Sequence, residues 1–312
     1  MAGSGGSEVS LRTRSGRTEA EPTLERSPSA DDRGALHSLA VRAAVPSDLL
    51  PRIITSIIAG PIVFIGAAAG GPWLIAIVLA ATAISVWEVT ALSETARAPI
   101  YRICGILAAW AIPLATATGT VAVGWLMLGA SAVAGLLRVA ARTGDSSALG
   151  AWALAVSIGV YVGALLASTI GLREGPDGQA WLLLVILSTW ACDIAAFLVG
   201  RSIGRHKLAP RISPQKSVEG LIGGVLGAVA VAAVGAVLLP LSPLRVLGLG
   251  FVVAIGAVLG DLAESAVKRQ LGAKDFGRIL PGHGGILDRV DSLLFSSWLA
   301  YGYVTITGWV PS

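Results

Sequence analysis

The sequence predicts an all-α protein, a polytopic membrane helix bundle with about nine transmembrane helices. Of its 312 residues, 54% are hydrophobic and 13% are charged, which is about half the charged share of an average soluble domain. The mean hydropathy is +0.76. The charges also leave long gaps, since none falls within residues 53–87, 103–137, 146–172 or 292–312. Uncharged apolar stretches of this length are typical of membrane spans.

These properties exclude a soluble enzyme, a nucleic-acid-binding protein and a secreted disulfide scaffold. The two cysteines, Cys104 and Cys192, both lie in apolar segments, so they indicate neither a disulfide framework nor a thiolate metal site. The isoelectric point of about 9.4 is explained by cytoplasmic loops rich in Lys and Arg, as is usual in membrane proteins.

Residues 1–50 differ in kind from the rest of the chain. They are rich in Gly, Ser, Arg and Glu and contain no aromatic residue. Such a segment buries too little apolar surface to offset its ordering entropy, so we predict a disordered cytoplasmic tail. It lacks the apolar core of a cleaved signal peptide.

From residue 51 onward, the apolar stretches divide into nine predicted helices. The run after Arg52 is too long for one helix and breaks at Gly70-Gly71-Pro72, and the next long run breaks at Thr118-Gly119-Thr120, because Gly and Pro interrupt helices. The predicted helices are 53–69, 73–92, 101–117, 121–137, 150–170, 180–199, 219–240, 244–266 and 290–310.

The distribution of basic residues predicts the orientation of these helices. With the N-terminus in the cytoplasm, 21 of the 23 Lys and Arg residues fall on the cytoplasmic side and only Arg173 and Arg245 fall on the other. Cytoplasmic loops carry such an excess of Lys and Arg. We therefore expect a cytoplasmic N-terminus and an external C-terminus.

Acidic residues set inside the last apolar stretches are the first candidates for a functional site. Asp261, Glu264, Ser265 and Lys268 are spaced i, i+3, i+4 and i+7, which places them on one face of a helix. A carboxylate at the centre of a membrane helix costs roughly 2.5–3.5 kcal/mol, so it usually faces a metal, a cation or water. Two interpretations follow: Mg²⁺ on the carboxylates with phosphates between metal and Lys/Arg, or an intramembrane ion-pair network such as Glu264 with Lys268.

A second pair of acids follows a glycine cluster. Asp288 and Asp291 are three residues apart at the start of the last predicted helix, just after Pro281-Gly282-His283-Gly284-Gly285. Glycines allow a sharp turn that presents backbone N–H groups to an anion near a helix start. Taken alone, such a cluster is a weak signal.

The ordered combination of these motifs resembles the signature of the phosphatidate cytidylyltransferases (CDP-diacylglycerol synthases). A second stretch resembles the upstream loop of the same family, and the resemblance covers about residues 185–300. The first set is Ser265-x-x-Lys268-Arg269, Lys274-Asp275-x-Gly277, Leu280-Pro281-x-His283-Gly284-Gly285 and Asp288-Arg289-x-Asp291, and the second is Asp193-x-x-Ala196-Phe197-x-x-Gly200-Arg201 and Ser213-Pro214-x-Lys216-Ser217-x-Glu219-Gly220.

This resemblance implies a fold, a reaction and partners. CTP and phosphatidic acid would give CDP-diacylglycerol and pyrophosphate, with Mg²⁺, in a homodimeric enzyme of the cell membrane whose active site faces the cytoplasm. Residues 51–180 would be N-terminal transmembrane helices, and residues 181–312 a catalytic transmembrane region with two cytoplasmic loops. Membrane lipids are expected partners and nucleic acid is not.

The expected site residues come from these motifs, from the acidic face of the predicted helix 244–266 and from the basic cytoplasmic loops. Catalysis by charge neutralisation is assigned to Asp261, Lys268, Asp288 and Arg289. The expected metal ligands are Asp261 and Asp288, with Asp291 and Glu264 as additional or supporting ligands. Substrate phosphates are expected to bind at Arg211, Lys216, Ser265, Lys274, His283, Gly284 and Gly285, besides Lys268 and Arg289.

The sequence is also compatible with proteins of other functional classes. A cation-coupled secondary transporter also has intramembrane acids and Gly-rich helices, although here the charges gather near one membrane face. A CDP-alcohol phosphatidyltransferase would carry a D-G-x-x-A-R segment, which is absent. A lipid or dolichol kinase that uses CTP would share much of the chemistry.

Overall fold

The computed structural model describes residues 49–142, 144–239, 241–277, 279 and 284–308. The predicted disordered tail, residues 1–50, lies almost wholly outside the described residues. Residues 48–312 form one compact unit, and the predicted boundary near residue 180 stays a prediction. The described helices are α2 (Leu49–Ala69), α3 (Gly71–Ala91), α4 (Pro99–Thr118), α5 (Val121–Ala140), α6 (Ser147–Glu174), α7 (Gly178–Ile203), α8 (Val218–Leu238), α9 (Pro243–Gln270) and α10 (Leu287–Thr307).

The all-α membrane fold predicted from the sequence is confirmed. Each of the nine predicted helices has a counterpart, and seven of the described helices, α3 to α9, are long and apolar enough to cross a membrane. In α2 the described apolar part, Ile57–Ala69, is shorter than these, and α10 carries charged residues in its first turns. The protein is therefore a multi-pass membrane protein, while the orientation of its termini stays a prediction.

Two predicted helix breaks occur where glycine and proline stand. Gly70 and Gly71 have φ of 68° and 50°, and proline occupies the first turn of α3. Gly119 ends α4 with φ of 64°. Positive φ is readily adopted only by glycine, so these residues turn the chain between antiparallel helices.

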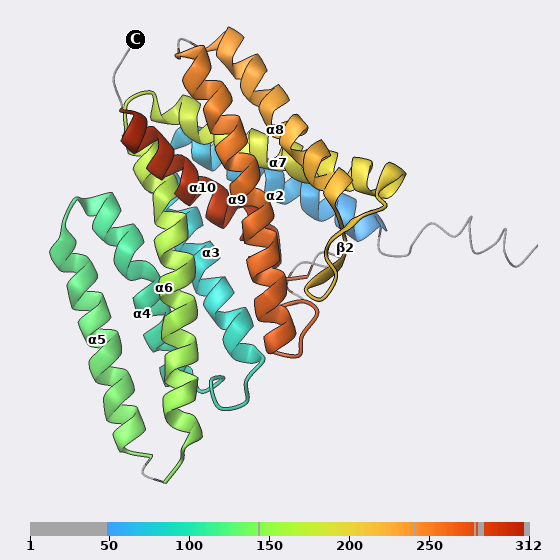
Figure 1. The fold of residues 1–312 in the computed structure, drawn as a ribbon. Coiled ribbons are helices and arrows are strands. Elements are labelled where there is room, and N and C mark those ends of the chain that lie inside the picture. The colour runs from blue at the N-terminus through green and yellow to red at the C-terminus, as the bar shows by residue number, and fades with distance from the viewer. Residues whose placement is uncertain (1–48, 143, 240, 278, 280–283, 309–312) are drawn as a thin grey trace, which may run out of the picture. The chain divides into compact units, whose positions relative to one another are not determined.

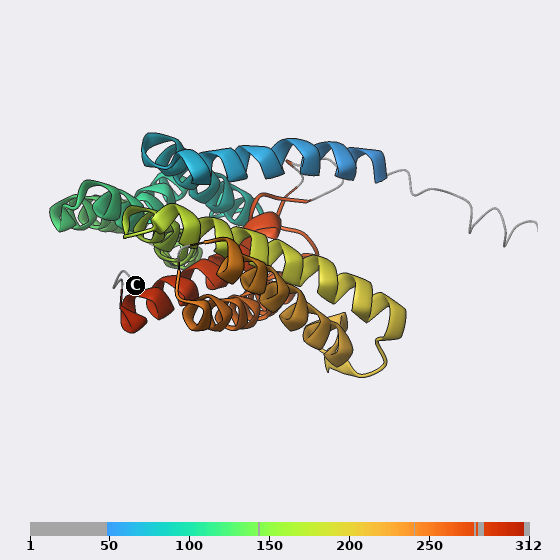
Figure 2. The ribbon, with the colours of Figure 1, turned by 90° about the horizontal axis from the view of Figure 1, so that it is seen from above.

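Helices pack both on the next helix in the sequence and on helices further along the chain. Helix α7 packs on α8, α4 on α6 and α9 on α10, and Figure 1 shows α4, α5 and α6 side by side. Figure 2 shows α2 along one edge of the bundle, where it contacts α3 and α7. The largest apolar core joins α3, α6, α7 and α10 through residues such as Val86, Val162, Leu182 and Leu294.

Helices α9 and α10 approach each other closely at glycines. A Cβ atom on Gly256 would lie 2.6 Å from Cα of Ser296. One on Gly260 would collide with the backbone of Asp291. Only residues without a side chain permit this contact, and it brings the acidic ends of the two helices together.

The structure corrects the predicted ends of three helices and adds a small sheet. Helix α9 continues to Gln270, α10 begins at Leu287 and α7 continues to Ile203, each beyond the apolar stretch used for prediction. The segment predicted as a loop contains two antiparallel strands, β1 (Lys207–Ala209) and β2 (Ser213–Ser217), with Lys207 opposite Ser217. Helix α8 begins directly after β2, where Oγ of Ser217 accepts the N–H of Gly220, as expected for a helix N-cap.

Candidate active site

The centre of the candidate site is an ion-paired lysine at the end of α9. Nζ of Lys268 lies 2.6 Å from Oε1 of Glu264 and 3.0 Å from Oδ1 of Asp288. The side chains of Glu264 and Asp288 are only 2% and 4% exposed. Buried carboxylates need such a partner. Of the two interpretations of the sequence, the ion pair of Glu264 with Lys268 is present in the structure, and Asp288 joins it.

Asp288 also holds the loop that precedes α10. Its Oδ2 accepts the backbone N–H groups of Phe276 at 3.1 Å and of Gly285 at 2.8 Å. Both oxygens of the carboxylate are therefore engaged by protein donors. Asp288 was predicted as a metal ligand, which stays a prediction. In the structure its carboxylate contacts Lys268 and the backbone N–H groups of Phe276 and Gly285.

Glu88 is a member of this region that the sequence analysis did not select. It lies near the end of α3 and is 2% exposed. Its two oxygens accept the N–H groups of Ile286 and Leu287 at 3.0 and 3.2 Å. The signal was present, since Glu88 is the only charged residue between Arg52 and Glu94, but its partners stand almost 200 residues later.

The β-hairpin covers the same end of α9. Nζ of Lys216 lies 2.6 Å from Oδ2 of Asp261, and Nε of Arg269 donates to the carbonyl oxygen of Ile212 at 3.4 Å. Oγ of Ser265 is 3.5 Å from Oδ1 of Asp261. The two contacts from the hairpin connect it to the helix that carries most of the predicted site residues.

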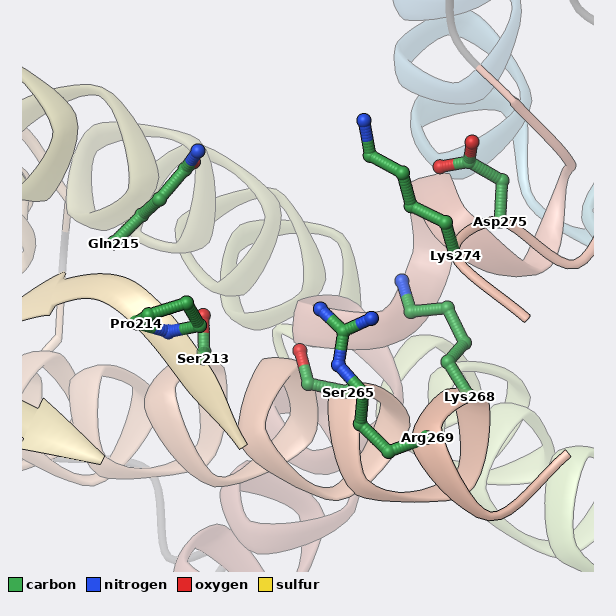
Figure 3. Close-up of a pocket in the computed structure, with 8 residues that line it drawn as sticks. All are labelled: Ser213, Pro214, Gln215, Ser265, Lys268, Arg269, Lys274 and Asp275. Atoms are coloured by element: carbon green, nitrogen blue, oxygen red, sulfur yellow. The ribbon is translucent and has the colours of Figure 1, made fainter. Parts of the chain in front are cut away.

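A pocket of about 170 Å³ lies between the hairpin and α9. In Figure 3 the amino groups of Lys268 and Lys274 and the guanidinium of Arg269 project to the same side of α9. The lining contains three basic side chains and one acidic side chain, which suits an anionic ligand. The lining residues are Ser213, Pro214, Gln215, Ser265, Lys268, Arg269, Lys274 and Asp275.

The remaining predicted phosphate-binding residues lie around this centre. Arg211 is exposed in the hairpin turn and Arg289 is exposed on α10. Gly284 has φ of 82°, a conformation that favours glycine, and Gly285 is buried beside Asp288. His283 lies outside the described residues.

Carboxylates of three helices stand next to this centre: Asp193 on α7, Asp291 on α10, and Asp261 on α9, whose neighbour Gly260 packs against the backbone of Asp291. Ser292 donates through Oγ to Asp193 at 3.2 Å and through its N–H to Asp291 at 2.7 Å. In the described hydrogen bonds, Asp193 and Asp291 each use one oxygen only. Oxygen ligands of this kind suit Mg²⁺, although the described His, Cys, Asp and Glu side chains form no group of three that could hold a metal as they stand.

Comparison with known proteins identifies the family. The model of the family described as "Cytidylyltransferase family" matches residues 50–307. The chain belongs to this cytidylyltransferase family. The match begins with α2 and ends with α10, so it includes both the helices and the charged site.

Several relatives support the assignment. A phosphatidate cytidylyltransferase of Brucella suis biovar 1 (strain 1330) is 35% identical over 272 residues, which are 82% of this chain and 93% of that protein. One of Staphylococcus haemolyticus (strain JCSC1435) is 46% identical over 121 residues, 38% of this chain and 46% of that protein. The uncharacterized protein YnbB of Escherichia coli (strain K12) is 44% identical over 130 residues, 41% of this chain and 44% of that protein.

These matches confirm the resemblance predicted from the motifs. As a cytidylyltransferase the protein is a nucleotidyltransferase enzyme, and the family gives no support to the transporter alternative. Lys268, Glu264, Ser265, Asp288 and Gly285 are brought together, while Lys216 and Asp261 form a neighbouring pair.

Proposed function

We propose that the protein transfers the cytidylyl group of CTP to phosphatidic acid, giving CDP-diacylglycerol and pyrophosphate for phospholipid biosynthesis. The observation that carries this proposal is the pocket beside Lys268, where the family's charged motifs meet. Lys268, Arg269 and Lys274 line it. Asp261, which pairs with Lys216, lies two turns before Lys268 on the same face of α9.

The chemistry explains why the site is dominated by cations. A phosphate oxygen of the lipid attacks the α-phosphorus of CTP, a new P–O bond forms, and the bond to the bridging oxygen of the β-phosphate breaks as pyrophosphate leaves. The attacking oxygen is already an anion near neutral pH, so no strong general base is required. The main barrier is repulsion between anions, which fixed cations and in-line positioning lower.

Each basic residue of the pocket binds phosphate from a different position. Lys268 is held by two carboxylates and so presents its remaining N–H to the pocket from a fixed place. Lys274 and Arg269 border the same pocket and bind the triphosphate. The pocket volume of about 170 Å³ is below the roughly 300–1,000 Å³ of sites that enclose a whole small molecule, so it receives phosphate groups, while the acyl chains of the lipid lie between helices.

We propose Mg²⁺ as the cofactor. Asp261 and Asp291 would hold it, because Gly260 beside Asp261 packs against the backbone of Asp291. Asp193 would be a third carboxylate, because Ser292 donates hydrogen bonds to both Asp193 and Asp291. Bound Mg²⁺ supplies charge neutralisation for the triphosphate and the leaving pyrophosphate. Asp288 and Glu264 contribute through Lys268.

We further propose that the site faces the cytoplasm of a cell-membrane enzyme and that the enzyme is a homodimer. The basic residues support the orientation, because 21 of 23 lie on the side that would be cytoplasmic and this excess marks cytoplasmic loops. CTP is available on that side. The dimer is carried by the family resemblance.

The reaction is tested with the purified full chain in detergent micelles that contain phosphatidic acid, CTP and Mg²⁺. We expect organic-phase CDP-lipid that disappears with a chelator and returns when Mg²⁺ is added back, with the circular dichroism of the helices unchanged. Product with diacylglycerol or dolichol as acceptor but not with phosphatidic acid would overturn the proposed substrate. Full activity in the chelator would overturn the proposed cofactor.

A further inference from the structure

Glu88 is a buried carboxylate whose charge has no cationic partner among the described residues. It is 2% exposed, and the ion pairs of the described chain involve other residues. A charged carboxylate within an apolar helix is costly and usually has a partner. A residue kept at this cost needs compensation, and its hydrogen bonds show where the compensation comes from.

The compensation comes from the start of a distant helix. Ile286 and Leu287 donate their backbone N–H groups to the two oxygens of Glu88 at 3.0 and 3.2 Å. The first N–H groups of a helix have no partner within the helix, and that end carries a partial positive charge. Glu88 of α3 thus serves as the N-terminal cap of α10, across 198 residues of sequence.

Two glycines are fitted to the same carboxylate. A Cβ atom on Gly277 or on Gly285 would collide with the carboxylate of Glu88. Asp288 holds the opposite side of this loop through the N–H groups of Phe276 and Gly285. The backbone N–H groups of Gly285, Ile286 and Leu287 are therefore held by two carboxylates, one from α3 and one from α10 itself.

We propose that Glu88 is a positioning residue for residues 284–287, here called the nucleotide loop. It fixes the backbone at residues 285–287 and so holds Gly284 and the Asp288–Lys268 pair in place for CTP. The identity of the nucleotide rests on the proposed function. The positioning itself is a property of the protein without substrate and is testable without it.

The first experiment measures hydrogen–deuterium exchange of the substrate-free full chain in detergent. We expect Glu88→Gln to speed exchange in peptides covering residues 284–288 by about tenfold. The amide of Gln has one acceptor oxygen where the carboxylate has two, so one of the two backbone hydrogen bonds is lost. Ser85→Ala is the matched control, since Oγ of Ser85 bonds only within its own helix, to Ala81. Unchanged exchange at residues 284–288 in Glu88→Gln, or equal acceleration in peptides of α4 to α6, would overturn the proposal.

The second experiment separates positioning from a general loss of structure. We expect Glu88→Gln to raise KM for CTP by about tenfold and to change KM for phosphatidic acid by less than about twofold. Equal rises in both would overturn the link to the nucleotide loop. If the unaltered protein makes no CDP-lipid, the proposed function fails, and the exchange experiment still decides whether Glu88 positions the loop.

A double-mutant cycle tests the contact itself. Gly285 lies outside the glycines with positive φ, so Gly285→Ala is hindered by the Glu88 carboxylate and not by its own backbone. We expect Gly285→Ala to lower kcat/KM by about tenfold in the wild-type chain and by less than about threefold in a Glu88→Ala chain, since contacting residues couple. Independent effects of the two changes would contradict the proposal.

Discussion

The ammonium group of Lys268 lies 3.0 Å from Oδ1 of Asp288, and this ion pair joins the last turn of α9 to the first turn of α10. The same ammonium lies 2.6 Å from Glu264. One cation thus pairs with two buried carboxylates and still borders the pocket. The pair links the structure of the bundle to the proposed binding of CTP phosphates.

Removing this cation is expected to affect both stability and activity. Lys268→Gln leaves two buried carboxylates without a charge partner, which costs about 3–5 kcal/mol when one member of a buried pair is lost. We expect a lower thermal midpoint in detergent and a loss of kcat of about 10²-fold or more. Lys207→Gln, at an exposed position of β1, should leave both unchanged. Wild-type turnover in Lys268→Gln would contradict the account.

The dependence on Mg²⁺ is expected to distinguish the carboxylates. Asp288 is engaged by Lys268, Phe276 and Gly285, so Asp288→Asn should lower kcat without changing the Mg²⁺ concentration that gives half-maximal rate. Asp261→Asn should raise that concentration by about tenfold. A Mg²⁺ titration of both variants tests this. A large shift for Asp288→Asn alone would make Asp288 the metal ligand.

Lys216 is expected to act on substrate more than on stability. Its pair with Asp261 is partly exposed, with side chains 21% and 39% accessible, and such pairs contribute about 0–1 kcal/mol. Lys216→Met should therefore shift the unfolding midpoint little but raise KM for CTP by about tenfold, as measured by initial rates. The more conservative Lys216→Arg should have a KM for CTP between those of the wild-type chain and Lys216→Met. Unchanged KM in Lys216→Met would remove this residue from the phosphate site.

The close contact of α9 and α10 is expected to tolerate no added side chain. A Cβ on Gly256 would lie 2.6 Å from Cα and 2.7 Å from N of Ser296, and a backbone gives way less readily than a flexible side chain. Gly256→Ala should destabilise the protein by about 1–3 kcal/mol, as overpacking does. Gly129→Ala on α5, where a Cβ would have no neighbour within 4 Å, is the control. Equal thermal midpoints of the two variants would contradict the contact.

The membrane fold was predictable because hydropathy and helix breaks are local properties. The break at Gly70-Gly71-Pro72 lies where it was predicted. The ends of α9 and α10 were not predictable from apolar stretches, because charged residues continue these helices and obtain their partners from other elements. The β-hairpin was missed because Ser213 to Ser217 shows no alternation of apolar and polar residues.

The candidate site was predictable where its residues share a helix. The spacing of Glu264 and Lys268 placed them on one helix face and left two interpretations, a metal site or an ion pair, and the structure contains the ion pair. Contacts between distant segments were not predictable: the capping of α10 by Glu88 and the pairing of Lys216 with Asp261 depend on how helices pack. A single sequence gives the residue types for such contacts but not their partners.

The most direct test of cytidylyl transfer is the fate of two labels. With CTP labelled at the α-phosphorus, we expect label in the lipid phase. With CTP labelled at the γ-phosphorus, we expect an equal amount of labelled pyrophosphate in water. Lys268→Gln should abolish both signals and Lys207→Gln neither. Label from the γ-phosphorus in the lipid, with none from the α-phosphorus, would show a CTP-dependent kinase and contradict the account.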